Sequence, residues 1–291
     1  MVNRKLIIDV GMHNGEDSSY YLSKGYSVVA IDADHKTVVN VKKKFQNEIN
    51  SEQFTVLNNA IAEQDGLKID FNVSEFSSWS SIKSEIANRE NLGINTVEVE
   101  TITLNSIFDK YGVPHYCKID IEGCDEVCLE TLKTYHEFPT FISVESECVG
   151  EGQVLTEEES LSTLTKLKAL GYTKFKLVDQ TYLEVLKPNE DYFDHAKILT
   201  FENPSIVHRI VKKIYRTLGI DSYHFSYREK LSKKLNFEFS VGASGPFGED
   251  LEGEWLNFEE AKTCLLKHRK DYFNLEAASA YGFWCDWHAT N

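Results

Sequence analysis

The chain has 291 residues, of which 42 % are hydrophobic and 26 % are charged, so the composition is that of a folded globular protein and excludes extensive disorder. The formal net charge is −15, which argues against a protein that coats nucleic acid backbones. Residues 201–291 hold 12 basic and 13 acidic side chains, so nearly all of the negative charge lies in residues 1–200. This shift is the first sign of a boundary near residue 200.

No stretch of the sequence approaches the ~18 apolar residues of a membrane-spanning helix. The first residues run straight into a strand-like apolar stretch at 6–8, whereas a signal peptide needs a longer apolar core and a small-residue cleavage site. The six cysteines are sparse and form no CxxC pair. We therefore expect a cytoplasmic protein with reduced thiols and no transmembrane segment.

Short apolar strands alternate with amphipathic helical stretches through residues 1–200. Strands are expected at residues 5–9, 27–31, 54–57, 68–73, 97–101, 116–121, 140–144, 175–178 and 197–201. Helices are expected at residues 15–24, 35–48, 104–110, 125–133 and 156–170. Repeated strand–helix units predict an α/β, Rossmann-like fold with a mostly parallel sheet and helices on both faces.

The character of the chain changes after residue 200. A helix with a basic side is expected at 206–218, a glycine-rich loop at 242–248 and a helix at 258–269, followed by an aromatic tail. We therefore predict one ligand-binding domain over residues 1–200 and a helical, loop-rich C-terminal extension over residues 201–291. Added segments of this kind are where an enzyme's acceptor specificity is expected to lie.

A glycine-containing turn follows the first predicted strand. Asp9, Gly11 and Gly15 form a DxGxxxG pattern where that strand ends and a helix begins. Glycines there allow a tight turn and close approach of a ligand to backbone N–H groups. Asp32 ends the second strand, where a carboxylate accepts hydrogen bonds from both hydroxyls of a ribose. Because ligands of open parallel sheets bind outside the carboxyl ends of the strands, the pattern predicts a nucleotide site.

Two kinds of nucleotide ligand are compatible with this turn. A dinucleotide is normally cradled by GxGxxG, and Asp9 would place negative charge beside its pyrophosphate. S-adenosylmethionine carries a sulfonium, an ammonium group and no phosphate, so an acid-lined pocket suits it better. The sequence therefore favours S-adenosylmethionine over a nicotinamide dinucleotide.

Six sequence stretches within about the first 150 residues occur in an order that is typical of a known family. They are DVGMHNGEDS (Asp9–Ser18), VVAIDAD (Val28–Asp34), LNNAIAEQDG (Leu57–Gly66), TITLNSIFDKYG (Thr101–Gly112), YCKIDIEGCDEVCLETL (Tyr116–Leu132) and FISVE (Phe141–Glu145). In this order they resemble the FkbM family of S-adenosylmethionine-dependent methyltransferases. The KIDIEG stretch is the most specific, whereas DxGxxxG alone is typical of the broader methyltransferase class. One departure is His13, where members of the family commonly have Asn.

The resemblance implies a class I methyltransferase sheet that binds S-adenosylmethionine. By position, the resemblance places Asp9, Gly11, Asn14 and Gly15 around the methionine part of the cofactor. It places Asp32 and Ala33 at the ribose, and Asn59 and Ala60 near the adenine. Ser80, with Trp79 and Ser81, matches a loop that closes on the cofactor.

Three acids end neighbouring strands, with Asp120 and Glu122 on one strand and Glu145 on the other. In a functional interpretation, Asp120 touches the methionine end of the cofactor or helps to deprotonate an acceptor, and Glu145 is a second catalytic candidate. In a structural interpretation, Lys118, which shares a strand face with Asp120, pairs with Glu122 or Glu145 and organises the strand ends. A divalent metal bound by the three acids is a further alternative, although the family resemblance requires no metal.

The histidines are less informative. His13 lies in the nucleotide turn and is the histidine best placed to act as a base. The spacings of Cys264 with His268 and of Cys285 with His288 are compatible with zinc, but they belong to no organised motif, so core packing is expected.

We predict an S-adenosylmethionine-dependent O-methyltransferase that acts on a hydroxyl of a carbohydrate or small-molecule acceptor. Methyl transfer depends largely on positioning, and a hydroxyl must also lose a proton. Two alternatives remain open at this point: a nicotinamide-dependent reductase that uses Asp32 for the ribose, and a non-catalytic S-adenosylmethionine-binding module.

Residues 243–255 are expected to form a loop over the acceptor side of the cofactor pocket. Glycines permit unusual backbone conformations in this region, and Pro246 fixes one bend. Phe247 and Trp255 would then offer stacking surface to a sugar ring. The alternative is that both side chains fill the core.

Overall fold

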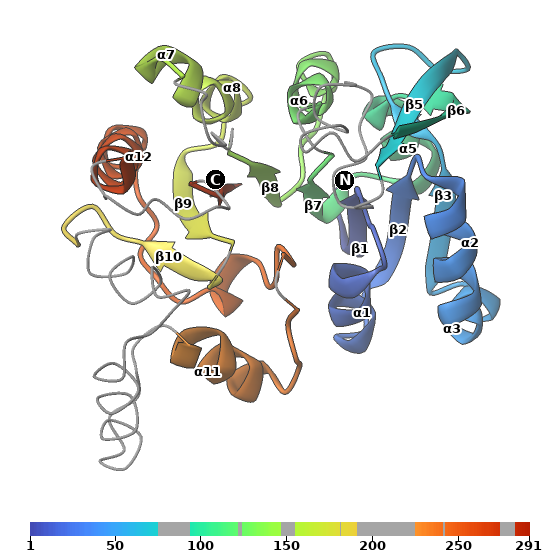
Figure 1. The fold of residues 1–291 in the computed structure, drawn as a ribbon, viewed down its shortest axis with the longest axis horizontal. Coiled ribbons are helices and arrows are strands. Elements are labelled where there is room, and N and C mark those ends of the chain that lie inside the picture. The colour runs from blue at the N-terminus through green and yellow to red at the C-terminus, as the bar shows by residue number, and fades with distance from the viewer. Residues whose placement is uncertain are drawn as a thin grey trace.

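The computed structural model describes residues 1–74, 94–121, 124–146, 155–180, 182–190, 225–240, 242–273 and 283–291. A large sheet is built from β1 (Asn3–Val10), β2 (Ser27–Asp32), β3 (Phe54–Asn58), β7 (Pro114–Ile119), β8 (Phe141–Glu145), β9 (Lys174–Asp179), β10 (Glu184–Leu186) and β11 (Cys285–Thr290). A small sheet consists of β4 (Ala60–Ile61), β5 (Lys68–Ser74) and β6 (Ile94–Ile102). The strand orders are β10-β9-β11-β8-β7-β1-β2-β3 and β4-β6-β5 (Figure 1).

The helices are α1 (Glu16–Ser23), α2 (His35–Lys44), α3 (Gln46–Asn50), α5 (Leu104–Tyr111), α6 (Asp125–Leu132), α7 (Glu157–Ser160), α8 (Ser162–Ala169), α11 (Phe225–Leu235) and α12 (Phe258–Phe273). The helix predicted at 156–170 is divided into α7 and α8, which meet at Leu161. The strand predicted at 197–201 and the basic helix predicted at 206–218 lie outside the described residues. None of the helices in the described ranges is long and apolar enough to cross a membrane.

The large sheet is mixed, so the prediction of a mostly parallel sheet is wrong. β8, β7, β1, β2 and β3 pair in parallel, as strand–helix units require. β11, however, pairs antiparallel with both β8 and β9, and β10 pairs antiparallel with β9. The physical reason is that β10 returns directly from β9 through a short turn, whereas β11 enters between two parallel strands from the end of the chain. Residues 285–290, part of the predicted extension, therefore lie inside the same sheet as β1.

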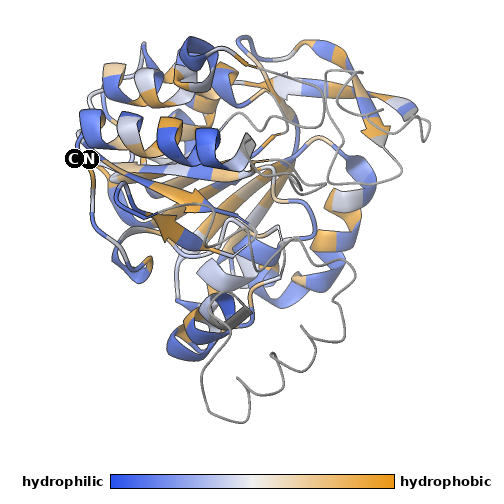
Figure 2. Ribbon diagram, turned by 60° about the vertical axis from the view of Figure 1, so that its left-hand side comes forward, coloured by the Kyte–Doolittle hydropathy of each residue, from blue (hydrophilic) through white to orange (hydrophobic). Residues whose placement is uncertain are grey.

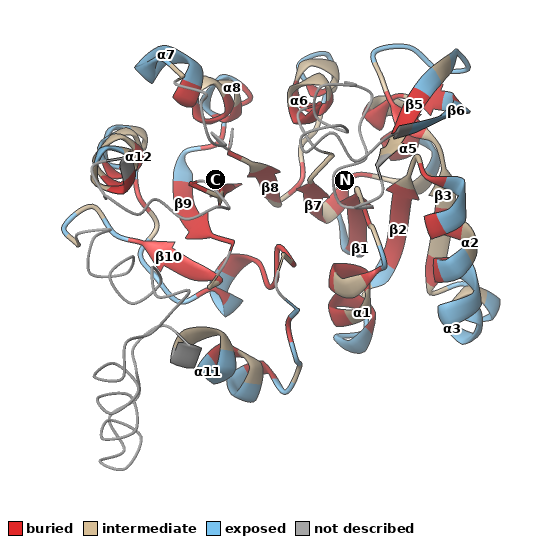
Figure 3. Ribbon diagram, viewed as in Figure 1, coloured by how far each residue is buried: buried red, intermediate tan, exposed pale blue. Residues whose placement is uncertain are grey.

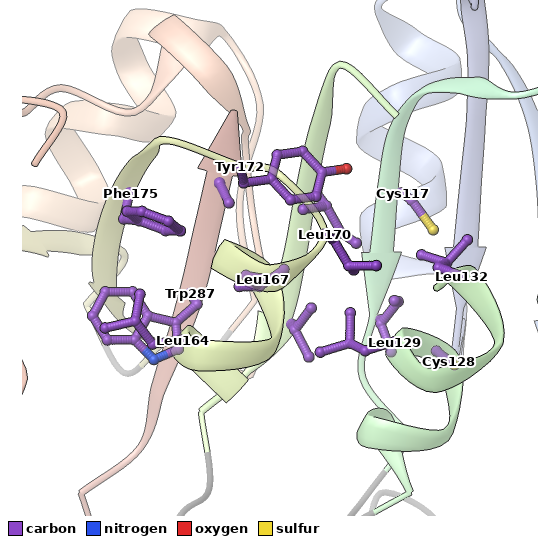
Figure 4. Close-up of a cluster of buried hydrophobic side chains, with 14 of the residues drawn as sticks. Cys117, Cys128, Leu129, Leu132, Leu164, Leu167, Leu170, Tyr172, Phe175 and Trp287 are labelled. Carbon is purple, nitrogen blue, oxygen red and sulfur yellow. The ribbon is translucent and has the colours of Figure 1, made fainter. Parts of the chain in front are cut away.

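One face of the large sheet, called here the helical face, is covered by α5, α6, α8 and α12 (Figure 1). Figure 4 shows part of its core, in which Leu129 of α6 and Leu167 of α8 pack near Cys117 of β7 and Trp287 of β11. All four side chains are fully buried. Figure 2 shows the hydrophobic strands between helices that turn polar residues outward, and Figure 3 shows burial concentrated on the strands. The helical face is thus an ordinary apolar core.

The opposite face, called here the mixed face, is covered by α1, α2, α11 and the segment 242–256. This segment contains only one short 3₁₀ turn, Gly248–Asp250. Its Phe247 stacks on Tyr116 of β7 with ring centroids 4.1 Å apart and is 8 % exposed. Two groups of α1 hold the segment: the Tyr21 hydroxyl donates to the Gly245 carbonyl oxygen, and the Asp17 carboxylate accepts from the backbone N–H of Ser244 and of Gly245.

Candidate cofactor site

The turn after β1 brings the ends of three parallel strands together. The backbone N–H groups of Gly11 and Met12 both donate to the carbonyl oxygen of Ile31 at the end of β2. Gly11 has a φ of +80°, and a Cβ atom there would lie 1.8 Å from the carbonyl oxygen of Asp120 after β7. A side chain at this position would therefore push β1 and β7 apart, which explains the first glycine of the DxGxxxG pattern.

The second glycine of the pattern begins α1. Gly15 has a φ of +72° and immediately precedes the helix. A Cβ atom there would come within 2.8 Å of the Phe45 ring. Gly15 therefore serves helix entry and packing, and it does not line the cavity described below.

Asp32 ends β2 with its carboxylate held in place by the backbone. One oxygen accepts from the N–H of His13 at 3.0 Å, and the other accepts from the N–H of Asp34 at 2.8 Å. Burial raises the pKa of the Asp32 carboxyl to about 6, against the lowering effect of these two hydrogen bonds. Each oxygen retains acceptor capacity, so the group can accept further hydrogen bonds from a ligand's hydroxyls.

A cavity of about 300 Å³ lies outside the carboxyl ends of the parallel strands. Of the predicted site residues, it is lined by Gly11, His13, Asp32, Ala33, Asn59, Ala60 and Asp120. Its wall also contains residues that the sequence analysis did not assign, among them Glu16, Phe71, Lys118, Ser240, Gly242 and Trp284. The cavity extends across the sheet from the end of β3 to the start of β11, at the edge where open α/β sheets bind ligands.

Other predicted site residues lie elsewhere. Asp9 is fully buried behind the cavity wall, and Asn14 lies with its amide 3.2 Å from the His13 ring nitrogens. Glu145 does not line the cavity but accepts a hydrogen bond of 3.1 Å from the indole N–H of Trp284, which does. The predictions for Trp79, Ser80, Ser81 and Glu122 fall outside the described residues.

Lys118 of β7 lies at the centre of a buried acidic cluster. Its Nζ atom donates to the Gly11 carbonyl oxygen at 2.9 Å. The same atom lies 3.3 Å from an Asp9 oxygen and 3.6 Å from oxygens of Asp17 and Asp120. Burial acts to lower the pKa of Lys118, but Asp9, Asp120 and Asp17 raise it well above its ordinary value, so the amine is charged. Lys118 thus pairs with three aspartates and not with Glu145, one of the two partners predicted from the sequence; the other, Glu122, lies outside the described residues.

Two buried aspartates at the rim of this cluster have unusual environments. Burial raises the pKa of Asp17 to about 6, although Lys118 and the two backbone N–H donors of the segment 242–256 act to lower it. Burial also raises the pKa of Asp286 on β11 well above its ordinary value, and the charge of Asp120 reinforces this. Asp286 accepts a hydrogen bond from the Gln180 amide. Acidic groups outnumber Lys118 here, so this end of the sheet is a favourable place for a cationic ligand.

His13 and Glu16 form a pair on the cavity wall. The His13 Nδ1 atom lies 3.6 Å from a Glu16 oxygen. Hydrogen bonding to Glu16 raises the pKa of His13 despite partial burial. His13 has a φ of +47°, an uncommon backbone conformation for a residue other than glycine. The pair lies at the start of α1 and can accept a proton from a group bound in the cavity.

The cysteine–histidine spacings correspond to packing contacts. The Cys264 thiol lies 3.6 Å from the Leu186 carbonyl oxygen, and the His268 Nε2 atom lies 2.8 Å from the Lys187 carbonyl oxygen. Burial lowers the pKa of His288 to about 3, so its ring is neutral. Within the described residues, no group of three or more His, Cys, Asp and Glu side chains is placed to hold a metal ion.

Phe247 and Trp255 do not reach the cavity, so the prediction that they offer stacking surface there is wrong. Phe247 is held in the core by Tyr116, as described above. Trp255 packs under the Lys176 ammonium group, whose nitrogen is 4.2 Å from the ring centroid. Both side chains face the mixed face of the sheet, away from the strand ends. Only the first residues of the segment, Gly242 and Ala243, line the cavity.

Three residues of the cavity wall are not among the site residues predicted from the sequence, although local sequence features point to them. Phe71 alternates with Ile69 and Val73 on β5, a pattern of one buried strand face. Glu16 directly follows the second glycine of the turn. Trp284 directly precedes β11, and the alternation of apolar and polar residues in Cys285–Thr290 indicates a strand that begins just after it.

One protein family matches the sequence. Residues 9–174, more than half of the chain, match the family described as Methyltransferase FkbM domain. Among curated proteins, none matches the sequence significantly.

Solved structures with a similar course of the chain include three methyltransferases. StiE O-MT residues 961–1257 is 8 % identical, with a TM-score of 0.41 over 99 % of this chain and 68 % of that chain. The C-terminal domain of precorrin-6Y C5,15-methyltransferase from Rhodobacter capsulatus is 13 % identical, with a TM-score of 0.35 over 61 % and 68 %. Phosphoethanolamine N-methyltransferase 2 of Haemonchus contortus, in complex with S-adenosyl-L-methionine, is 9 % identical, with a TM-score of 0.37 over 100 % and 49 %. These likenesses are distant, so the assignment to a family rests on residues 9–174.

Proposed function

The chain belongs to the FkbM family of S-adenosylmethionine-dependent methyltransferases, and we propose that it methylates a hydroxyl group of a carbohydrate or small-molecule acceptor. The match to a methyltransferase domain favours this reaction over that of a nicotinamide-dependent reductase. The enzyme uses S-adenosylmethionine, which supplies a methyl group bound to a positively charged sulfur atom.

The described wall residues fit this cofactor. Asp32 presents a carboxylate with free acceptor capacity for the ribose hydroxyls. Ala33, Asn59 and Ala60, from the ends of β2 and β3, line the same end of the cavity and are proposed to surround the adenine. Further along the cavity, at the end of β7, the excess of carboxyl groups around Lys118 favours a ligand with positive charge.

The observation that carries the choice of a hydroxyl acceptor is the pair of proton-accepting groups on the cavity wall. A hydroxyl must lose its proton during methylation, so a base within reach assists its reaction. His13, oriented by Glu16, is the proposed base. Asp120, 19 % exposed and 3.6 Å from Lys118, is proposed to orient the acceptor or the methionine end of the cofactor. Glu145 acts on the same region through Trp284.

The cysteines support a reducing cellular location. Five of them, Cys117, Cys124, Cys128, Cys264 and Cys285, are buried free thiols. Proteins of oxidising compartments commonly pair such residues in disulfides, so we place the enzyme in the cytoplasm as part of the proposal.

The test is methyl transfer from isotopically labelled S-adenosylmethionine to a panel of sugars, other alcohols and amines, with the methylated atom identified by mass spectrometry. We expect methyl ethers as products. We expect His13→Asn to lower kcat and to remove a base from the pH profile while cofactor affinity is retained. Products methylated only on nitrogen or carbon would contradict the proposal.

A further inference from the structure

The cavity is longer than the nucleoside part of the cofactor requires. The predicted ribose group, Asp32, ends β2, and Asn59 and Phe71 extend the wall beyond it. Trp284 and Gly242 line the opposite end, beside β8 and β11. Four strand steps separate β2 from β11 in the sheet, which corresponds to roughly 19 Å at the usual strand spacing. With the nucleoside at Asp32 and the methionine part beside the carboxyl groups around Lys118 of β7, the end at Trp284, two strands further along the sheet, is left for another molecule.

The indole of Trp284 is fixed at both of its ends. Its Nε1–H donates to a Glu145 oxygen at 3.1 Å. At the far end of the ring, Cη2 lies 3.3 Å from the position that a Cβ atom on Gly242 would occupy. Gly242 has a φ of +88° and so combines a turn with room for the ring. The indole is therefore a pre-oriented, partly exposed aromatic surface, which binds a ring at little entropic cost.

The charges around the cavity restrict what that ring carries. Four carboxyl groups line the cavity, those of Glu16, Asp17, Asp32 and Asp120, and the basic side chains that face them among the described lining residues are Lys118 and His13, whose pKa is raised by Glu16. S-adenosylmethionine has one more positive than negative charge, so an acidic excess remains after it binds. An acceptor with a carboxylate or phosphate would be repelled.

We propose that Trp284, oriented by Glu145, forms the acceptor subsite, which takes a hydroxylated ring without negative charge and discriminates against anionic acceptors. The ring stacks on the indole, Glu145 holds the indole N–H, and Gly242 leaves the space that keeps the indole in place. This inference rests on the proposed methylation of a hydroxyl and adds the residues and the charge class that select the acceptor.

The test uses three sugars that share one ring and differ in charge: methyl glucoside, methyl glucuronide and methyl glucosaminide. Binding to protein saturated with S-adenosylhomocysteine is measured by saturation-transfer NMR, and methylation by initial rates. We expect the neutral and the cationic sugar to bind better than the anionic one. Trp284→Ala should raise the KM or dissociation constant of the neutral sugar about tenfold, and Trp284→Phe, which keeps a ring, should have a smaller effect. Affinity for S-adenosylhomocysteine should stay within twofold in both variants.

Trp255→Phe is the matched control. The Trp255 indole N–H also donates to a glutamate, Glu249 at 2.8 Å, but this ring does not line the cavity. We expect this variant to bind acceptor as the wild type does. Preference for the anionic sugar, binding of none of the three, or an unchanged constant in Trp284→Ala overturns the subsite. If hydroxyls are still methylated in that case, the proposed function stands, whereas methylation of amines alone overturns both.

Discussion

On the helical face of the central sheet the strands present apolar side chains to helices, whereas on the mixed face apolar side chains face α1, α2 and α11, and β7 and β9 also carry one buried lysine each. On β7, Cys117 points into the apolar core, but Lys118, one residue later, points to the acidic cluster. On β9, Phe175 is in the apolar core and Lys176 faces the segment 242–256. The composition of a strand face therefore depends on what covers it.

The backbone of the covering element explains this difference. A helix satisfies its own N–H and C=O groups, so the strands beneath it need only supply apolar surface. The segment 242–256 has few internal partners, and its buried backbone groups must find others. Asp17 accepts from two of its N–H groups, and Lys176 donates to two of its carbonyl oxygens, those of Gly248 and Leu251. Buried charged side chains on the mixed face thus supply hydrogen bonds that the backbone of the segment 242–256 does not make within a helix.

The largest effect is expected from removal of the cation of the mixed face. Lys118→Met leaves Asp9, Asp17 and Asp120 without their shared partner, and an uncompensated buried charge costs about 3–5 kcal/mol of unfolding free energy. Ile119→Val, the next residue on β7, is the control on the helical face and should cost only about 1 kcal/mol. Urea denaturation measures both. Equal effects of the two substitutions would show that the faces do not differ as described.

A cavity in the helical face should cost slightly less and leave the site intact. Leu167 of α8 is fully buried in the cluster of Figure 4. Leu167→Ala removes packing contacts, and we expect a loss of about 3 kcal/mol. Because Leu167 does not line the cavity, calorimetry on the folded variant should give the wild-type affinity for S-adenosylmethionine. A large loss of that affinity would indicate that the two faces are coupled.

Asp32→Asn tests cofactor binding at the carboxyl ends of the parallel strands, independently of the stability of the fold. We expect S-adenosylmethionine binding to weaken by about 1.5–3 kcal/mol, because hydrogen bonds to a charged acceptor are lost. The measurement is calorimetry at pH 7.5. An affinity within error of the wild type would mean that Asp32 is not the ribose group.

Asp32→Asn weakens cofactor binding, but it should stabilise the fold of the cofactor-free protein at high pH. The pKa of Asp32 is raised from 3.8 to about 6 on folding, so its stabilising contribution is complete below pH 4 and is lost as the pH rises through about 6. At pH 8 the ionised carboxylate therefore destabilises the fold, and Asp32→Asn should raise Tm there while making stability less dependent on pH between 4 and 7. A lower Tm at pH 8 would contradict the assigned direction of the pKa.

The smallest effect is expected at the other lysine of the mixed face. The Lys176 ammonium group donates to the carbonyl oxygens of Gly248 at 3.1 Å and Leu251 at 2.7 Å. Lys176→Met leaves these acceptors without their donor, which should cost about 1–2 kcal/mol. Lys176 does not line the cavity, so kcat should be unchanged. Greater susceptibility of the segment 242–256 to proteolysis would identify where the stability is lost.

Local patterns in the sequence were sufficient for the α/β class and for bringing together the residues of the proposed nucleotide end of the site. DxGxxxG and Asp32 fall within one strand–helix–strand unit, so short-range geometry brings Gly11, His13 and Asp32 to one edge of the sheet. The alternation of strands and helices predicts the parallel half of that sheet, because each crossover helix carries the chain back to the same edge.

Only the tertiary structure decided where the end of the chain lies and what Lys118 pairs with. β11 enters the sheet antiparallel between β8 and β9 after about a hundred intervening residues, and local periodicity does not specify the partner of such a strand. Its arrival places Asp286 beside the acidic cluster and Trp284 on the cavity wall. The glycine-rich loop predicts a ligand-stacking role for Phe247, but the loop covers a sheet face and buries this side chain against Tyr116. Contacts between residues distant in sequence depend on the packing of whole elements, which is why the proposed acceptor end of the site became visible only in three dimensions.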